Sequence, residues 1–204
     1  MMVKKSKFSL KLILLLFLIS KLAMALEEPQ FAIIKSFSEY EIRKYKDRLA
    51  VQVEYSNNDR GFQYLFNYIS GANINTEKID MTTPVTQSLK IDMTIPVTQS
   101  LKDDKMVMQF FLPYKFTINT APKPTNERVS LIIIEGGYYA VIRYSGRSTD
   151  KNYYKKFEEL KEYLKKDKIE IIESGIKATF NRPFTLPVFR KNEVMLKINY
   201  NEIS

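Results

Sequence analysis

The first half of the chain alternates apolar and polar residues in short runs, and one longer run has helical spacing. The two-residue period of a half-buried strand is clearest in AVQVEY, and strands are predicted at 31–37, 40–45 and 50–55. A helix is predicted next, because an apolar stripe recurs at i, i+3, i+4 and i+7, at Phe62, Leu65, Phe66 and Ile69. Asn58 or Asp59 can cap its start, and Gly71 ends it.

The second half repeats this order of elements. After a strand at 106–112 and a proline-bearing connection at 113–128, further strands are predicted at 129–135, 138–144, 169–172, 177–181 and 194–198. A helix that starts at Asp150 carries the apolar stripe Tyr153, Phe157, Leu160 and Leu164. The pattern predicts an α+β fold of two repeats, in which a curled antiparallel sheet, a distorted barrel, has two helices on its outside. A flat ferredoxin-like sandwich is the alternative.

A twelve-residue segment occurs twice in succession, as IDMTTPVTQSLK at 79–90 and IDMTIPVTQSLK at 91–102. The copies differ only at Thr83 and Ile95. Pro84 and Pro96 lack the backbone N–H that a sheet needs, so each copy is predicted to lie at a sheet edge or loop rim. A single doublet is too short for a solenoid. One copy is therefore expected in the native position, with the other bulging outward.

The N-terminus has the features of a secretory signal peptide. Four lysines precede the apolar run 12–19, and Ala23-Met24-Ala25 fits a signal peptidase site. We therefore expect residues 1–25 to be removed and residues 26–204 to form one exported domain, periplasmic or secreted. An uncleaved anchor is the alternative, although Lys21 ends the apolar run early.

Composition excludes several chemistries. The 204 residues include no cysteine and no histidine, which rules out Cys-His and Ser-His-Asp catalysis, His-ligated zinc and thiol redox centres. Loss of the five lysines in residues 1–25 lowers the formal charge from +9 to +4. No block of five basic residues remains, so we expect no nucleic-acid partner.

Five motifs resemble those of the SOUL/HEBP haem-binding proteins. They are EIRKY at 41–45, GF at 61–62, KIDMTTPVT at 78–86, FFLP at 110–113, and the stretch from PF at 183–184 through Pro187 to RKNEV at 190–194. The similarity extends from about Phe31 to Ile198. It implies two repeats of one helix with antiparallel strands, and binding of haem or a related tetrapyrrole beside a helix. The family has its KIxMTxPV element once, so this chain departs from the pattern at the doublet.

The resemblance implies a set of ligand-binding residues around the first helix. Basic side chains there serve the haem propionates in the family, and apolar ones form the wall of the pocket. The matching candidates here are Arg60, Phe62, Leu65, Phe66, Ile69 and Lys78. The competing interpretation is that the apolar stripe is simply the core face of the helix.

Iron coordination and carboxylate chemistry have weaker candidates. Some family members have been thought to hold iron through histidine, which this chain lacks, so Met or Tyr would be the iron ligand or only the macrocycle would be held. The side chains considered as ligands are Met81, Met93, Met106, Met108, Tyr64 and Tyr68. Those considered for a carboxylate site are Asp80, Asp92, Glu41 and Glu77, each more simply a solvated charge. No metal site is predicted from them.

Glu193 has three interpretations. Effector-binding domains of similar architecture use a buried glutamate against cationic ligands, and a hydrolase could use one as a base. A salt bridge to Arg190 is the structural alternative. The sequence thus predicts an exported, non-enzymatic tetrapyrrole-binding protein, with a general binding domain for amphipathic or cationic small molecules as the second hypothesis and a hydrolase as the third.

Overall fold

The computed structural model describes residues 27–56, 60–74, 95–102, 105–181 and 184–201. The first half contains β1 (Phe31–Ser36), β2 (Glu41–Tyr45), β3 (Arg48–Tyr55), α2 (Gly61–Ile69), β4 (Asn73–Ile74), β5 (Val97–Lys102) and β6 (Lys105–Phe111). The second contains β7 (Lys123–Pro124), β8 (Val129–Ile134), β9 (Gly137–Tyr144), α3 (Asp150–Lys166), β10 (Glu170–Ile171), β11 (Ile176–Thr179), a 3-10 turn (Pro187–Phe189) and β12 (Asn192–Asn199).

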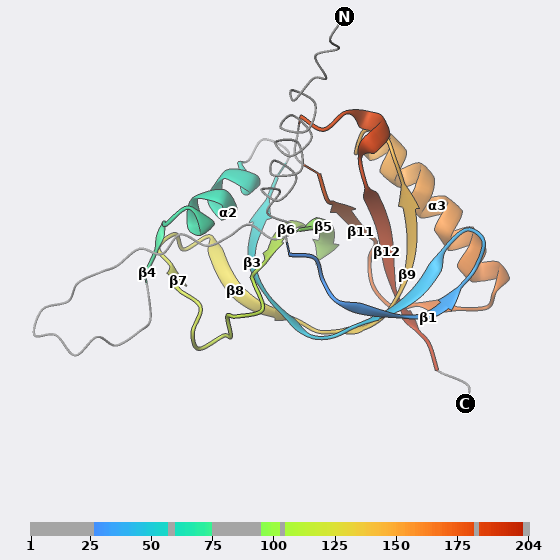
Figure 1. Ribbon diagram of the computed structural model, residues 1–204, viewed down its shortest axis with the longest axis horizontal. Helices are drawn as coiled ribbons and strands as arrows, with labels where there is room; N and C mark the ends of the chain where they lie inside the picture. Colours follow the sequence, from blue (N-terminus) through green and yellow to red (C-terminus); the bar gives the residue numbers. More distant parts are fainter. Residues whose placement is uncertain (1–26, 57–59, 75–94, 103–104, 182–183, 202–204) are drawn as a thin grey trace, which may run out of the picture.

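Most strands belong to one antiparallel sheet that curls into a half-barrel (Figure 1). Among the described residues the strand order is β1-β2-β9-β12-β11-β5-β6-β3-β8, with β10 added on β12. A small separate pair joins β4 to β7, which lies inside the connection predicted at 113–128. The predicted curled antiparallel sheet with two helices is confirmed.

Each helix covers the outer face of one half of the sheet. In Figure 1, α2 lies over one side of the curl and α3 over the other. Helix α2 packs on β3, β6 and β8, whereas α3 packs on β9, β12 and β10. Two separate clusters of buried apolar side chains result, one under each helix, with Val51, Leu65 and Phe110 in the first and Ile42, Leu160 and Val194 in the second. Neither α2 nor α3 covers the inner, concave face of the sheet.

Helix α3 follows its sequence signals closely. The Thr149 side chain accepts a hydrogen bond from the Asn152 backbone N–H at 3.3 Å, which satisfies one of the free donors at the helix start. Asp150 in the first turn and two lysines in the last turn suit the helix dipole. Leu160 and Leu164 of the predicted stripe are fully buried, and Tyr153 and Phe157 pack against the same cluster.

The second copy of the doubled segment is a central strand, not an edge. Its VTQSLK forms β5, which pairs with β11 on one side and β6 on the other. Pro96 lies immediately before the strand, so its missing N–H removes no bond from the ladder. The prediction of an edge or rim was therefore wrong for this copy. The first copy, residues 79–90, lies outside the described residues.

The predicted signal peptide, residues 1–25, also lies outside the described part of the chain, which begins at residue 27. Within the part that is described, no helix is both long and apolar enough to cross a membrane.

Candidate functional site

Helix α2 presents a pair of aromatic rings to solvent. Phe62 and Phe66 are 44% and 42% exposed, and their rings stack with centroids 6.0 Å apart. The Phe62 ring also meets the buried ring of Phe110 on β6 edge-on, at 5.2 Å. The pair therefore lies where α2 packs on β6. Large aromatic rings left half exposed beside each other form a ready apolar contact for a planar ligand.

The other predicted members of this site divide between core and surface. Leu65 and Ile69 are 0% and 5% exposed and face the sheet, so they support the helix rather than form its outer wall. Arg60 is exposed at the residue before the helix, whose first turn contains no acidic side chain. A carboxylate is favoured at such a helix start. Lys78 lies outside the described residues.

Three of the four candidate iron ligands that can be placed are engaged elsewhere. Tyr68 is buried and donates to the Pro122 carbonyl at 2.8 Å, and burial raises its pKa. The Tyr64 hydroxyl accepts a hydrogen bond from Arg128 at 2.9 Å on the opposite flank of α2 from Phe62 and Phe66. Met108 is buried in the core cluster under α2, and Met106 is half-buried. The other candidates, Glu77, Asp80, Met81, Asp92 and Met93, lie outside the described residues.

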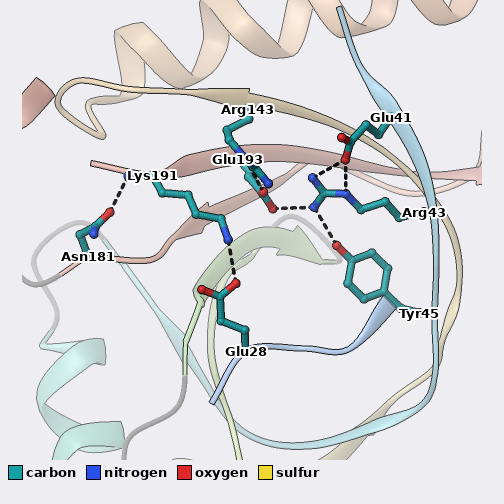
Figure 2. Close-up of polar contacts among 8 residues, drawn as sticks. All are labelled: Glu28, Glu41, Arg43, Tyr45, Arg143, Asn181, Lys191 and Glu193. Carbon is teal, nitrogen blue, oxygen red and sulfur yellow. Dashed lines mark hydrogen bonds and ion pairs between the residues drawn. The ribbon is translucent and has the colours of Figure 1, made fainter. Parts of the chain in front are cut away.

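The concave face of the sheet carries a buried ion-pair network (Figure 2). Glu193 on β12 is 1% exposed and accepts from Arg43 on β2 at 3.1 Å and from Arg143 on β9 at 3.3 Å. Arg43, itself 2% exposed, also contacts Glu41 at 2.7 Å and the Tyr45 hydroxyl at 3.2 Å. Burial alone would lower the pKa of Arg43, but the charge of Glu193 and the contacts with Tyr45 and Glu41 outweigh it and raise the pKa.

The expected salt bridge of Glu193 to Arg190 is wrong. Arg190 directs its Nε to the Thr185 carbonyl at 2.8 Å, because the chain turns between the 3-10 segment and β12. Both oxygens of Glu193 instead meet guanidinium groups from neighbouring strands. A carboxylate neutralised in this way is poorly suited to bind a cationic ligand or to act as a general base.

Two adjoining hollows form a trough along the concave face. The smaller encloses about 560 Å³ counted to its open mouth, and the larger about 1290 Å³. Gln109, Ile134, Glu135, Tyr139 and Ile176 line both, so the hollows are continuous. This trough was not predicted from the sequence.

A row of polar side chains crosses the trough. Gln109 donates to Gln52 at 2.8 Å and accepts from Thr98 at 3.1 Å, which links β3, β6 and β5. Beside this row, Tyr45 and Tyr139 meet edge to face at 5.5 Å. Burial raises the pKa of each of these two phenols to about 12.

Residues 27–30 form a strap across one end of the smaller hollow. Glu27 pairs with Arg48 on β3 at 3.2 Å, and Glu28 pairs with Lys191, just before β12, at 2.7 Å (Figure 2). Pro29, the next residue along the strap, lines the hollow. The strap thus ties the start of the described chain to both sides of the trough.

A comparison with protein-family models matches residues 26–197 to the family described as SOUL heme-binding protein. The chain belongs to the SOUL family. A search of curated proteins finds no match.

Solved structures share the SOUL fold of this chain at low sequence identity. The C-terminal domain of EcmrR has a TM-score of 0.55 at 9% identity, covering 85% of this chain and 99% of that domain. A hydrolase from Listeria innocua has a TM-score of 0.51 at 11% identity, covering 90% of this chain and 98% of that one. An uncharacterized conserved protein from Listeria innocua has a TM-score of 0.51 at 11% identity, covering 88% of this chain and 96% of that one. At such identities these likenesses show the fold alone.

Sequence reasoning about this SOUL protein missed the arginines of the concave face. Arg43 and Arg143 each occupy an inward position of a strand, at the same parity as Tyr45 and Val141. A charged residue at an inward position of a strand could have predicted a buried ion pair, because charged side chains are rarely buried without a partner. The identity of that partner required the strand pairing.

Proposed function

We propose that this protein binds a tetrapyrrole against the exposed aromatic pair of α2. Membership of a heme-binding family makes a haem-like ligand plausible, and the stacked, half-exposed rings of Phe62 and Phe66 are the observation that supports this place. Arg60, at the start of the helix, pairs with an acidic side group of the ligand. Haem supplies a flat apolar macrocycle and two propionates, and these residues suit both features.

The macrocycle, rather than the iron, is the part that we propose to be recognised. The sequence has no histidine, and among the described residues Tyr68 and Met108 are committed to core contacts. Binding then rests on apolar contact with the rings and on charge pairing with propionates. In this proposal the protein sequesters or carries its ligand and catalyses no reaction.

The test is an absorbance titration of residues 26–204 with hemin and, in parallel, with metal-free protoporphyrin. Saturable binding of both with similar affinity is expected, since iron ligation contributes little. The double variant Phe62→Ala/Phe66→Ala should weaken both by about tenfold or more, because two ring contacts are lost. Arg60→Ala should weaken both to a smaller extent.

The matched control removes two exposed rings elsewhere. Phe184 and Phe189, which precede β12 in the sequence, are 97% and 71% exposed, so Phe184→Ala/Phe189→Ala removes at least as much exposed aromatic surface from a segment other than α2. It should leave both affinities unchanged. Equal losses of affinity in the two double variants would contradict the assignment of the binding site to α2. Tight binding of hemin without binding of protoporphyrin would contradict recognition of the macrocycle.

Export is the second part of the proposal. The basic start, apolar run and Ala23-Met24-Ala25 motif support removal of residues 1–25. Mass spectrometry of the protein recovered from the producing cell should give Leu26 as the first residue. Recovery of the intact chain in the membrane fraction would instead support the uncleaved anchor.

A general small-molecule function has one observation in its favour. The trough on the concave face is large enough for a ligand and lies on the opposite side of the sheet from α2. Hydrophobic dyes that bind without competition from hemin, and without sensitivity to Phe62→Ala/Phe66→Ala, would support this second function.

A further inference from the structure

The smaller hollow of the trough has an apolar wall. Its aromatic and aliphatic lining includes Tyr45, Phe111, Tyr139, Phe180 and Met195. The empty volume of about 560 Å³ includes open space at the mouth of the hollow, so a ligand bound there would stay partly open to solvent. The apolar wall suits the apolar part of a ligand.

Four charged residues line the same hollow, and they differ in burial. Lys46 and Glu135 are exposed and have opposite charges, so they suit a solvated rim. Arg48 is 5% exposed and Glu193 is 1% exposed, so these two belong to the wall. A ligand inside the hollow meets these two buried charges.

The Arg48 guanidinium has an unused donor. Its Nη2 contacts Glu27 at 3.2 Å and the Leu112 carbonyl at 3.2 Å. The guanidinium also lies over the rings of Phe111 and Tyr114, at 4.8 and 4.4 Å from their centroids. The buried Nη1 has no hydrogen-bond partner among the described residues. Buried donors are rarely left unpaired, so this nitrogen marks a place where an acceptor fits.

The buried carboxylate, in contrast, is already satisfied. Each oxygen of Glu193 accepts a hydrogen bond from a guanidinium, one from Arg43 and one from Arg143. A cation that entered the hollow would find that carboxylate occupied, whereas an anion would find a charged donor available. Burial also lowers the pKa of Arg48, as expected for a cation surrounded by apolar groups.

We propose that the smaller hollow binds an amphipathic carboxylate of the fatty-acid type, whose carboxylate accepts a hydrogen bond from Nη1 of Arg48 and whose chain lies against the aromatic wall. A single negative charge suits this place, because Glu27 already offsets part of the arginine charge at 3.2 Å. A doubly charged phosphate would bring excess charge into an apolar hollow. The site is separate from the aromatic pair of α2 and goes beyond the tetrapyrrole function.

Calorimetric titration of the protein, expressed from its full sequence, with dodecanoate tests this site. Dodecanol and dodecyltrimethylammonium carry the same chain with a neutral and a positive head. Saturable binding of dodecanoate is expected, with dodecanol weaker and the cation weakest. Arg48→Gln should weaken dodecanoate by about 10- to 100-fold, the effect of losing a hydrogen bond to a charged group, and leave dodecanol unchanged.

Arg147→Gln is the matched control, because Arg147 is an exposed arginine that does not line the hollow. It should bind dodecanoate as the wild type does. Ile176→Trp adds a second test that keeps Arg48, since it places a larger side chain in the wall of the hollow. If circular dichroism shows Arg48→Gln to be unfolded, loss of dodecanoate binding in folded Ile176→Trp, with hemin binding retained, supports the site.

Three results would overturn the proposal. They are equal dodecanoate affinity in folded Arg48→Gln and wild type, preference for the cationic amphiphile, and unchanged dodecanoate binding in Ile176→Trp. Failure of the tetrapyrrole proposal is distinguishable, because Phe62→Ala/Phe66→Ala should retain dodecanoate binding whether or not hemin binds. Displacement of dodecanoate by hemin would place both ligands in one site and overturn the separation.

Discussion

Glu193 and Arg43 lie 150 positions apart in the sequence, yet their side chains meet at 3.1 Å with almost no exposure to solvent. Glu193 bridges β2 and β9 through its two guanidinium partners, and β9 itself lies between β2 and β12 in the sheet. The ion pair therefore fixes three neighbouring strands from the concave side, the face opposite α2 and α3.

Glu193→Gln should destabilise the fold strongly. The substitution keeps the shape of the side chain but leaves Arg43 buried with the half-exposed Glu41 as its one remaining charged partner among the described residues. Removal of one member of such a pair costs about 3 kcal/mol. Urea unfolding followed by circular dichroism measures the loss. Glu158→Gln is the control, because its pair with Lys161 is 60% and 41% exposed and is worth less than about 1 kcal/mol. Similar losses in both variants would show that the buried pair contributes no special stability.

Two residues one position apart on α2 should separate stability from binding. Leu65→Ala removes a side chain that is 0% exposed, so the free energy of unfolding should fall by about 2–5 kcal/mol. Phe66→Ala removes a ring that is 42% exposed, so its effect on unfolding should be smaller and its effect on hemin affinity larger. Thermal unfolding and hemin titration of both variants check this. A folded Leu65→Ala protein with greater loss of hemin affinity than Phe66→Ala would reverse the assignment of the two faces.

Deleting either copy of the doubled segment should leave a folded domain. Deletion of 91–102 brings VTQSLK of the first copy to the position of β5, and deletion of 79–90 retains the second copy. The two products differ only in Thr or Ile before the proline. Ile95 packs against the cluster that contains Tyr139 and Phe180, so the product with Ile should be more stable by about 1 kcal/mol.

Thermal melts of the two deletions measure this difference, which corresponds to about 2–4 °C in a domain of this size. Deletion of 79–102 is the control, because it removes β5 and breaks the ladder between β11 and β6. That chain should be unfolded. A cooperative melt for it, or none for the deletion of 91–102, would contradict the equivalence of the copies.

The fold should lose stability in alkaline solution as its buried phenols ionise. The pKa values of Tyr45, Tyr139 and Tyr153 are raised by burial from 10.0 to about 12. Their stabilising contribution is complete below pH 10 and is lost as the pH rises from about 10 to about 12, because the unfolded chain releases these protons first. Tyrosine absorbance and far-ultraviolet circular dichroism, recorded together against pH, should show exposed tyrosines ionising before the fold is lost. Ionisation of every tyrosine near pH 10 with the fold intact would contradict this.

The sequence alone predicted the elements that are determined by neighbouring residues in the chain. The stripe that ends at Leu160 and Leu164, with Thr149 and Asp150 at its start, determines α3 without reference to the rest of the chain. The α2 stripe likewise predicted a helix, but not which of its members face outward, because Phe62 and Phe66 differ from Leu65 only in how the helix is rotated on the sheet.

Features that depend on strand pairing were not predictable in this way. Arg43 faces Glu193 because β9 pairs with both β2 and β12, and no local signal specifies that order. The trough has the same origin, since it exists only where β8 and β11 curl toward each other around Ile134 and Ile176. Five ordered motifs did identify the family, because they extend over nearly the whole matched range.

The identity of β5 has a consequence for folding itself. The ladder between β11 and β6 contacts only VTQSLK, and the chain offers that hexapeptide twice, twelve residues apart. Either copy can therefore fill this place in the sheet. If the first copy filled it, the second copy would follow the strand in the sequence, and no residue of β5 would change in identity. Ile95, packed where the first copy supplies threonine, biases this choice toward the second copy, by a ratio of about five if the difference is about 1 kcal/mol. The duplication thus gives this chain two ways to place the same hexapeptide between β11 and β6.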